Sequence, residues 1–207
     1  VADSEYELKE AYQLRYQVYC NEKRWLSPAD YPDRMETDKF DEKAVHVVAL
    51  DSEFRVVGYI RILLEADYPD LPFLKHPSLS AMKISYPHLA ELCRFIIRLG
   101  RNGLFIAKNI LKVVWQTSMY MDLENWSIVC EPSLIRLIYK FKYYFEPLST
   151  PAMYYGGFTQ PAILNARQTL HRWKVTDREA WRFYHQEVAE QLLSVPRVNN
   201  DLNAQRA

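Results

Sequence analysis

The sequence has no excess charge of either sign, few cysteines and no long apolar run. Its 26 basic and 26 acidic residues give a formal net charge of zero, so we expect no broad electrostatic surface for nucleic acid. No run of about 18 apolar residues occurs, so the sequence predicts no transmembrane helix and no stable membrane insertion. Cys20, Cys93 and Cys130 form an odd, widely spaced set without a disulfide framework or a metal-ligand pattern. We therefore expect a cytoplasmic protein without a metal site.

The sequence is rich in residues that build a core. Hydrophobic residues make up 49% of the chain and aromatic residues 14%, which argues against disorder. At 207 residues the chain is long enough for a domain with a sizeable core. It contains no internal repeat or linker, so we predict a single domain over residues 1–195 and a polar tail over 196–207.

Helix and strand signals alternate along the chain. Ser4 and Glu7 form a capping-box pattern that predicts a helix over residues 5–21. The following patterns predict, in chain order, a hairpin of strands 44–50 and 55–65, an irregular connection 66–88, a strand 89–97, a helix 104–121, a strand 125–131, a helix 132–142, a strand pair 145–148 and 152–156, and helices 160–173 and 177–193. This order predicts an α/β fold with a mixed sheet.

The strand 89–97 is the central feature of the sequence. Its alternation places Glu91 and Cys93 on one face and Arg94 on the other, and charged residues inside an apolar strand are usually paired or functional. The segment 98–103 then leads into a helix. Free N–H groups at a helix start can bind an anion, so this corner is a candidate phosphate site.

The order of elements resembles the GNAT acyltransferase fold, with a splayed central sheet flanked by helices and with extra C-terminal helices. The resemblance implies that strands 89–97 and 125–131 are parallel and hold the pantetheine arm of an acyl thioester between them. The turn departs from the acetyl-CoA fingerprint Arg/Gln-x-x-Gly-x-Gly/Ala, because Arg101 occupies the fourth position, where glycine is usual. This departure favours acyl carrier protein, whose arm carries one phosphate, as partner, with its acyl-phosphopantetheine as co-substrate and no tightly bound cofactor. The expected donor-binding residues are Arg98, Gly100, Arg101, Gly103 and Lys108.

An ordered set of residues resembles the signature of acyl-homoserine lactone synthases. It spans about the first half of the chain and consists of Leu14-Arg15-Tyr16-Gln17-Val18-Tyr19, Trp25, Asp38-x-x-Asp41, Arg61 and Glu91-x-x-Arg94. The resemblance implies that Glu91 and Arg94 are catalytic. It implies that the substrate-binding residues are Arg15, Trp25, Asp38, Asp41 and Arg61.

Longer segments resemble long-chain N-acyl amino acid synthases, above all N-acyl tyrosine synthases, and exosortase-associated acyltransferases. These segments are residues 15–22, 31–33, 36–41, 44–46 and 131–137. We therefore predict an N-acyltransferase that moves a medium or long acyl chain from acyl carrier protein to the α-amine of a free amino acid, with tyrosine favoured and Glu91 as general base. Two alternatives stay open: an acyl-homoserine lactone synthase that uses S-adenosylmethionine, and a non-catalytic module that binds acyl carrier protein or lipid.

The charged residues also have structural interpretations. Glu91 and Arg94 could form an internal ion pair, although residues three apart on a strand need a bulge to meet. Arg15 could clamp the loop that carries Asp38 and Asp41, or it could hold the acceptor's carboxylate, a role for which Arg61 is the other main candidate and Arg94 a third.

Other residues are assigned mainly to packing. Trp25 is interpreted as a packing anchor that walls a pocket, and most other aromatic residues as core. Cys93 is rejected as a nucleophile because no base or helix start is predicted beside it. The histidines without a recognisable partner are interpreted as structural; they are His46, His76 and His88.

Overall fold

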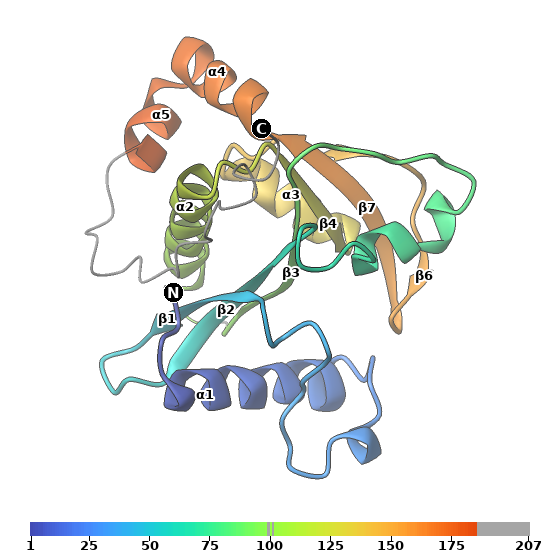
Figure 1. The fold of residues 1–207 in the computed structure, drawn as a ribbon. Helices are drawn as coiled ribbons and strands as arrows, with labels where there is room; N and C mark the ends of the chain where they lie inside the picture. The colour runs from blue at the N-terminus through green and yellow to red at the C-terminus, as the bar shows by residue number, and fades with distance from the viewer. Residues whose placement is uncertain (99, 101, 186–207) are drawn as a thin grey trace, which may run out of the picture.

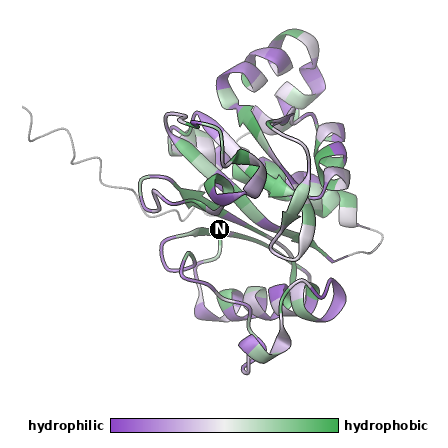
Figure 2. Cartoon of the chain, turned by 90° about the vertical axis from the view of Figure 1, so that its right-hand side faces the viewer, coloured by the Kyte–Doolittle hydropathy of each residue, from purple (hydrophilic) through white to green (hydrophobic). Residues whose placement is uncertain are grey.

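The computed structural model describes residues 1–98, 100 and 102–185, and Figure 1 shows its fold. A seven-stranded mixed sheet has the order β1 (Val45–Leu50), β2 (Val56–Leu64), β3 (Leu89–Ile97), β4 (Asn125–Cys130), β7 (Gly157–Asn165) and β5 (Glu146–Pro147), and β6 (Ala152–Tyr154) pairs with β7. Helices flank this sheet, and Figure 2 shows hydrophobic residues concentrated in the central strands. The predicted α/β architecture is confirmed.

Two helices cover opposite faces of the first half of the sheet. Helix α1 (Glu5–Tyr16) begins with the predicted capping box at Ser4 and packs on β1 and β2. It continues as a π-helical segment, Gln17–Glu22. Helix α2 (Gly103–Tyr120) packs on the other face (Figure 1).

The central strands separate along their length. Strands β3 and β4 pair in parallel from Leu89–Asn125 to Leu92–Ile128, and the pairing ends there. Beyond that point β3 continues beside β2, and β4 pairs with β7. The predicted splay between these two strands is confirmed.

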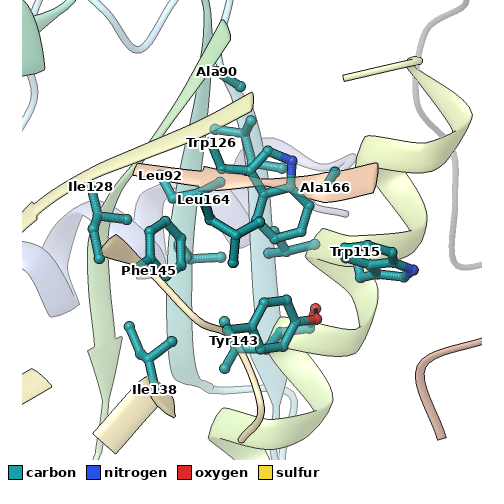
Figure 3. Packing of buried hydrophobic residues seen from close by; sticks show 14 of the residues in the cluster. Ala90, Leu92, Trp115, Trp126, Ile128, Ile138, Tyr143, Phe145, Leu164 and Ala166 are labelled. Atoms are coloured by element: carbon teal, nitrogen blue, oxygen red, sulfur yellow. Dashed lines mark hydrogen bonds between the residues drawn. The ribbon is translucent and has the colours of Figure 1, made fainter. Parts of the chain in front are cut away.

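The largest core cluster is built around aromatic rings. The ring centroid of Trp115 lies 5.4 Å from that of Trp126, 6.2 Å from that of Tyr143 and 4.4 Å from that of Trp173 in α4 (Ala166–Thr176). Figure 3 shows Trp115, Trp126 and Tyr143 among the apolar side chains between the sheet and α2. These aromatic residues therefore stabilise the core, as expected from packing alone.

The last part of the sheet differs from the prediction. Strands β5 and β6 do not pair with each other in the described part of the chain; each pairs with β7. Strand β7 occupies positions where the sequence predicts the start of a helix, and α4 begins only at Ala166. Tyr155 and Gly156 both have positive φ, 46° and 76°, as a tight two-residue hairpin turn between β6 and β7 requires. Its buried apolar run fits a strand as well as a helix, so periodicity alone could not decide.

The chain's last described helix is α5 (Arg178–His185). The rest of the predicted helix 177–193 and the predicted tail lie outside the described residues. Within the described part of the chain, no helix combines the length and the apolar character that crossing a membrane requires.

Candidate active site

Two adjoining cavities open where β3 and β4 separate. The larger, about 990 Å³, lies in the gap between these strands and is walled by α1, α2 and α3 (Pro132–Lys140). The smaller, about 90 Å³, lies at its end and is bounded by the loop 25–41, the connection 66–88 and the β6–β7 hairpin. The residues that line both cavities are Tyr19, Trp25, Cys93, Arg94, Val129 and Thr159. A long ligand in the larger cavity can therefore present its end to the smaller one.

The start of α2 forms one end of the larger cavity. Arg98, Gly100 and Gly103 line it, as the donor-binding prediction requires. Lys108 does not line it; its Nζ lies 4.1 Å from the centroid of the Phe183 ring in α5, which favours a packing role. Arg101 lies outside the described residues.

A bulge in β3 brings Arg94 to the small cavity. Along the pairing with β2, Tyr59 faces Ile96 but Arg61 faces Cys93, so β3 has an extra residue here. Arg94 has a φ of 58°, which is uncommon for a non-glycine residue and turns its side chain toward the face that Glu91 occupies. The two do not pair with each other in the described structure; each bonds to other groups.

Glu91 is buried at the inner wall of the small cavity. The backbone N–H of Phe73 donates to Glu91 Oε2 at 2.8 Å. Burial raises the pKa of Glu91 to about 7, although the Phe73 N–H, Arg61 and Arg94 favour the charged form. A carboxylate with such a pKa can accept a proton near neutral pH, which suits a general base.

Three arginines and three acids form a largely buried network beside Glu91. Arg15 bonds to Glu36 and Asp41, Arg61 to Asp38 and Asp41, and Arg94 to Glu36 and Asp38. The distances from 2.6 to 3.1 Å in the pairs of Arg61 and Arg94 are those of charge-assisted hydrogen bonds. Three positive and three negative charges cancel, so the network offers no net charge to the interior.

The arginines hold Glu36 and Asp38 in their charged form. Burial alone would raise the pKa of Glu36, but Arg94 and Arg15 outweigh it and lower that pKa to about 2. Burial is likewise outweighed at Asp38, where Arg61 lowers the pKa to about 2. These carboxylates are therefore ion-pair partners at neutral pH rather than bases.

The network ties the loop 25–41 to α1 and the sheet. Arg15 is fully buried, is bonded to Glu36 and Asp41, and does not line the small cavity, which fits a loop clamp. Arg61 is also buried, but it does line that cavity. Glu36 is absent from the predicted site; its position two residues before Asp38 in an acidic loop is the only sequence signal for it.

Trp25 fastens the loop to the β6–β7 hairpin and walls both cavities. Its indole stacks on Tyr19 with 5.9 Å between ring centroids. A Cβ at Gly156 would lie 2.5 Å from the Trp25 carbonyl oxygen, and one at Gly157 would lie 2.8 Å from its ring. Both glycines thus allow a close approach, and the packing-anchor interpretation fits this contact.

Cys93 has the features of an unreactive thiol. It accepts a hydrogen bond from Arg61 Nε at 3.3 Å, and burial raises the pKa of its thiol despite the nearby guanidinium groups. A raised pKa disfavours the thiolate that a nucleophile needs, which supports the rejection of this residue as a catalyst.

The histidines without a predicted partner all have one in the structure. His46 bonds to the Tyr59 hydroxyl at 2.7 Å and lies at the edge of the charge network. His76 bonds to Ser78, and His88 to a backbone carbonyl. Among the described residues no group of histidine, cysteine or acidic side chains could hold a metal ion.

Comparison with known proteins finds sequence similarity to acyltransferases. A family model for the acetyltransferase (GNAT) domain matches residues 14–106. The isovaleryl-homoserine lactone synthase of Bradyrhizobium diazoefficiens is 27% identical over 168 residues, which cover 79% of this chain and 75% of that protein.

Solved structures of acyl-homoserine lactone synthases have the same fold. BjaI, a CoA-dependent enzyme solved with S-adenosylmethionine and isopentyl-CoA, superposes with a TM-score of 0.68 and 25% identity, over 81% of this chain and 80% of its own. LasI superposes with a TM-score of 0.60 and 18% identity, over 79% and 85% of the two chains. The chain therefore has a GNAT-like acyltransferase fold and is related to the acyl-homoserine lactone synthases.

Proposed function

We propose that the protein is an N-acyltransferase that moves a medium or long acyl chain from a thioester donor to the α-amine of an amino acid. The observation that carries this proposal is the position of Glu91. It is the buried carboxylate with a pKa near 7, and it lines the small cavity at the end of the splayed strands. A base at this place can reach an amine in the small cavity while the thioester lies in the larger one.

The chemistry follows from these positions. Glu91 accepts a proton from the acceptor's ammonium group, and the free amine attacks the thioester carbonyl. The new C–N bond forms, the C–S bond breaks, and the thiolate of the donor leaves and takes up the second proton that the attacking nitrogen loses. Beyond Leu92 the edge of β3 that faces β4 has no strand partner, so backbone N–H groups there would stabilise the oxyanion.

The proposed donor is acyl carrier protein. Support comes from the departure of the turn from the CoA fingerprint and from Arg98, an exposed cation at the larger cavity where an acidic carrier could dock. CoA is the competing donor, because BjaI is CoA-dependent. Rates with matched acyl-ACP and acyl-CoA distinguish the two, and equal or better use of acyl-CoA contradicts the proposal.

The proposed acceptor is tyrosine, and Arg94 is proposed to hold its carboxylate. Among the arginines of the network, Arg94 has the most exposed side chain, at 17%, and its Nη1 makes no hydrogen bond within the described residues. Arg61 has both Nη atoms bonded to acids, and Arg15 does not reach the cavity. Aromatic side chains around the cavity, including Tyr154, suit an aromatic acceptor.

A lactone synthase that acylates S-adenosylmethionine is the second candidate. It is favoured by the curated relative and by BjaI. The two candidates share the first chemical step, because S-adenosylmethionine also presents the α-amine and α-carboxylate of an amino acid. They differ in the acceptor's side chain and in whether a lactone forms.

Competition for one labelled acyl-ACP tests the proposal. Purified protein is given tyrosine, phenylalanine, glycine, serine, ornithine and S-adenosylmethionine together, and the products are identified by mass spectrometry. Acyl-tyrosine as the main product is expected. Preference for another amino acid contradicts the tyrosine assignment, and an acyl-lactone supports the second candidate. If neither acyl-ACP nor the matched acyl-CoA gives a product, the protein is not an acyltransferase.

A further inference from the structure

We infer that the peptide group between Pro72 and Phe73 positions Glu91 and that the hydroxyl of Tyr154 holds this peptide group in place. The inference rests on the proposed role of Glu91 as base. It makes Tyr154 a positioning residue, because its hydroxyl acts on Glu91 through the peptide group.

Both polar ends of this single peptide group are occupied. Its N–H, from Phe73, donates to Glu91 Oε2 at 2.8 Å, and its C=O, from Pro72, accepts from the Tyr154 hydroxyl at 2.8 Å. A trans peptide is planar, with N–H and C=O pointing in opposite directions. Tyr154 and Glu91 therefore lie at opposite ends of one chain of hydrogen bonds, although they come from β6 and β3.

Local sequence explains why this N–H is available. Pro72 begins a short 3-10 helix, Pro72–Lys75, and the first N–H groups of a helix have no partner within it. Proline has no N–H, and Leu71 provides no side-chain cap, so the Phe73 N–H is the first free donor. The Phe73 ring is buried in a hydrophobic cluster that also contains Leu63 and Leu79, which fixes the position of the peptide group.

The hydrogen bond from Phe73 gives the two oxygens of Glu91 different environments. Oε2 accepts the hydrogen bond from the peptide, whereas Oε1 makes no hydrogen bond within the described residues and can accept a proton; Glu91 itself lines the small cavity. The Tyr154 hydroxyl polarises the peptide, which strengthens the N–H as a donor and stabilises the charged carboxylate. Burial raises the pKa of Tyr154, so its hydroxyl keeps its proton at neutral pH.

Two variants change the donor strength of Tyr154 in opposite directions. Tyr154→Phe removes the hydroxyl and keeps the ring, so the pKa of Glu91 should rise by roughly half to one unit, the size expected for one hydrogen bond. Incorporation of 3,5-difluorotyrosine at position 154 makes the hydroxyl a stronger donor, so the pKa of Glu91 should fall. Tyr120→Phe, at an exposed position at the end of α2, is the matched control.

The pKa of Glu91 is read in two ways. The first is the ¹³C NMR titration of its carboxyl carbon, assigned by its loss in Glu91→Gln, which does not depend on turnover. The second is the acidic limb of the pH profile of kcat/KM. Tyr154→Phe should shift both midpoints upward and lose activity several-fold at pH 6.5, with recovery at high pH.

The outcomes separate this inference from the proposed function. Near-normal turnover of Glu91→Gln contradicts the proposed base, whatever Tyr154 does. If Glu91 is required but neither variant at position 154 moves the carboxyl titration, the positioning role is wrong. If Tyr154→Phe does not fold, the difluorotyrosine protein decides: a downward shift supports the inference, and an unchanged midpoint overturns it.

Discussion

The carboxylates of this site differ in pKa because their partners differ. Glu36 and Asp38 lie against guanidinium groups, and their pKa values are lowered to about 2. Glu91 receives one backbone N–H, and burial raises its pKa to about 7. At neutral pH Glu36 and Asp38 stay charged, while Glu91 can exchange a proton.

The charged residues of the site were more predictable from sequence than their partners. The ordered set that includes Arg61, Asp38 and Glu91 predicts residues that the structure brings together. The hydrogen-bond donor to Glu91, the N–H of Phe73, could not be predicted, because it is a backbone group in an irregular connection and no side-chain pattern marks it. Tyr154 likewise depends on long-range packing that periodicity does not encode.

Removal of one acid from the network should destabilise the protein. Glu36→Gln leaves three guanidinium groups, two of them buried, with two carboxylates, so we expect the free energy of unfolding at pH 7 to fall by about 3–5 kcal/mol. Urea unfolding measures this loss. Glu42→Gln, on an exposed loop position, is the control and should change little. Equal effects of the two substitutions would show that the Glu36 pairs do not stabilise the fold.

The same network predicts how stability depends on pH. The pKa of Glu36 in the folded protein is about 2, below its ordinary value of 4.5, so the unfolded chain binds more protons between these values. The contribution of Glu36 is therefore complete above pH 4.5 and is lost as the pH falls toward 2. Unfolding free energies measured across this range should fall less steeply in Glu36→Gln than in the wild-type protein. Parallel curves would contradict this assignment.

At the scale of elements, two local irregularities build the site. The bulge in β3 turns Arg94 into the cavity, and the β6–β7 hairpin turn packs on Trp25. The extent of β3 was predicted because alternation is a local signal. The left-handed conformation of Arg94 is accompanied by bonds to Glu36 and Asp38 in a distant loop, so the sequence around it could not reveal it.

Substitution of Gly156 should weaken the packing of the β6–β7 turn on Trp25 and destabilise the protein. Gly156→Ala places a methyl group 2.5 Å from the Trp25 carbonyl oxygen at a residue with φ of 76°, so we expect a loss of about 1–3 kcal/mol in unfolding free energy. Thermal unfolding with tryptophan fluorescence measures it. Gly100→Ala, where a Cβ meets nothing within 4 Å, is the matched control. Unchanged stability of Gly156→Ala would show that the close contact is not required.

The corner before α2 should control donor choice. Arg98→Glu should raise the apparent KM for acyl-ACP several-fold at low salt, because it repels an acidic carrier, and the effect should shrink at high salt. Steady-state rates at two ionic strengths measure this. Lys9→Glu, on the exposed face of α1, is the charge-matched control. A salt-independent effect, or an equal effect of both substitutions, would contradict docking at this corner.

At the scale of the whole molecule, the sheet places the cavity proposed for the thioester next to the cavity proposed for the amine. The gap between β3 and β4 gives a cavity of about 990 Å³, enough for an extended ligand, and the loop 25–41 and the connection 66–88 enclose the small cavity at its end. Both segments are fastened by buried polar contacts, the first by the arginine network and the second by Glu91 and Tyr154. The proposed base thus also helps to hold the segment that covers it.

The pH profile of kcat/KM for the wild-type protein and Glu91→Gln tests the central claim, that Glu91 is the base for acyl transfer, most directly. The wild-type profile should have an acidic limb with a midpoint near pH 7, because only the charged carboxylate accepts a proton. Glu91→Gln should fold normally, lose turnover by roughly 100-fold or more, and lack this limb. Near-normal turnover of Glu91→Gln with the same acidic limb would contradict the account.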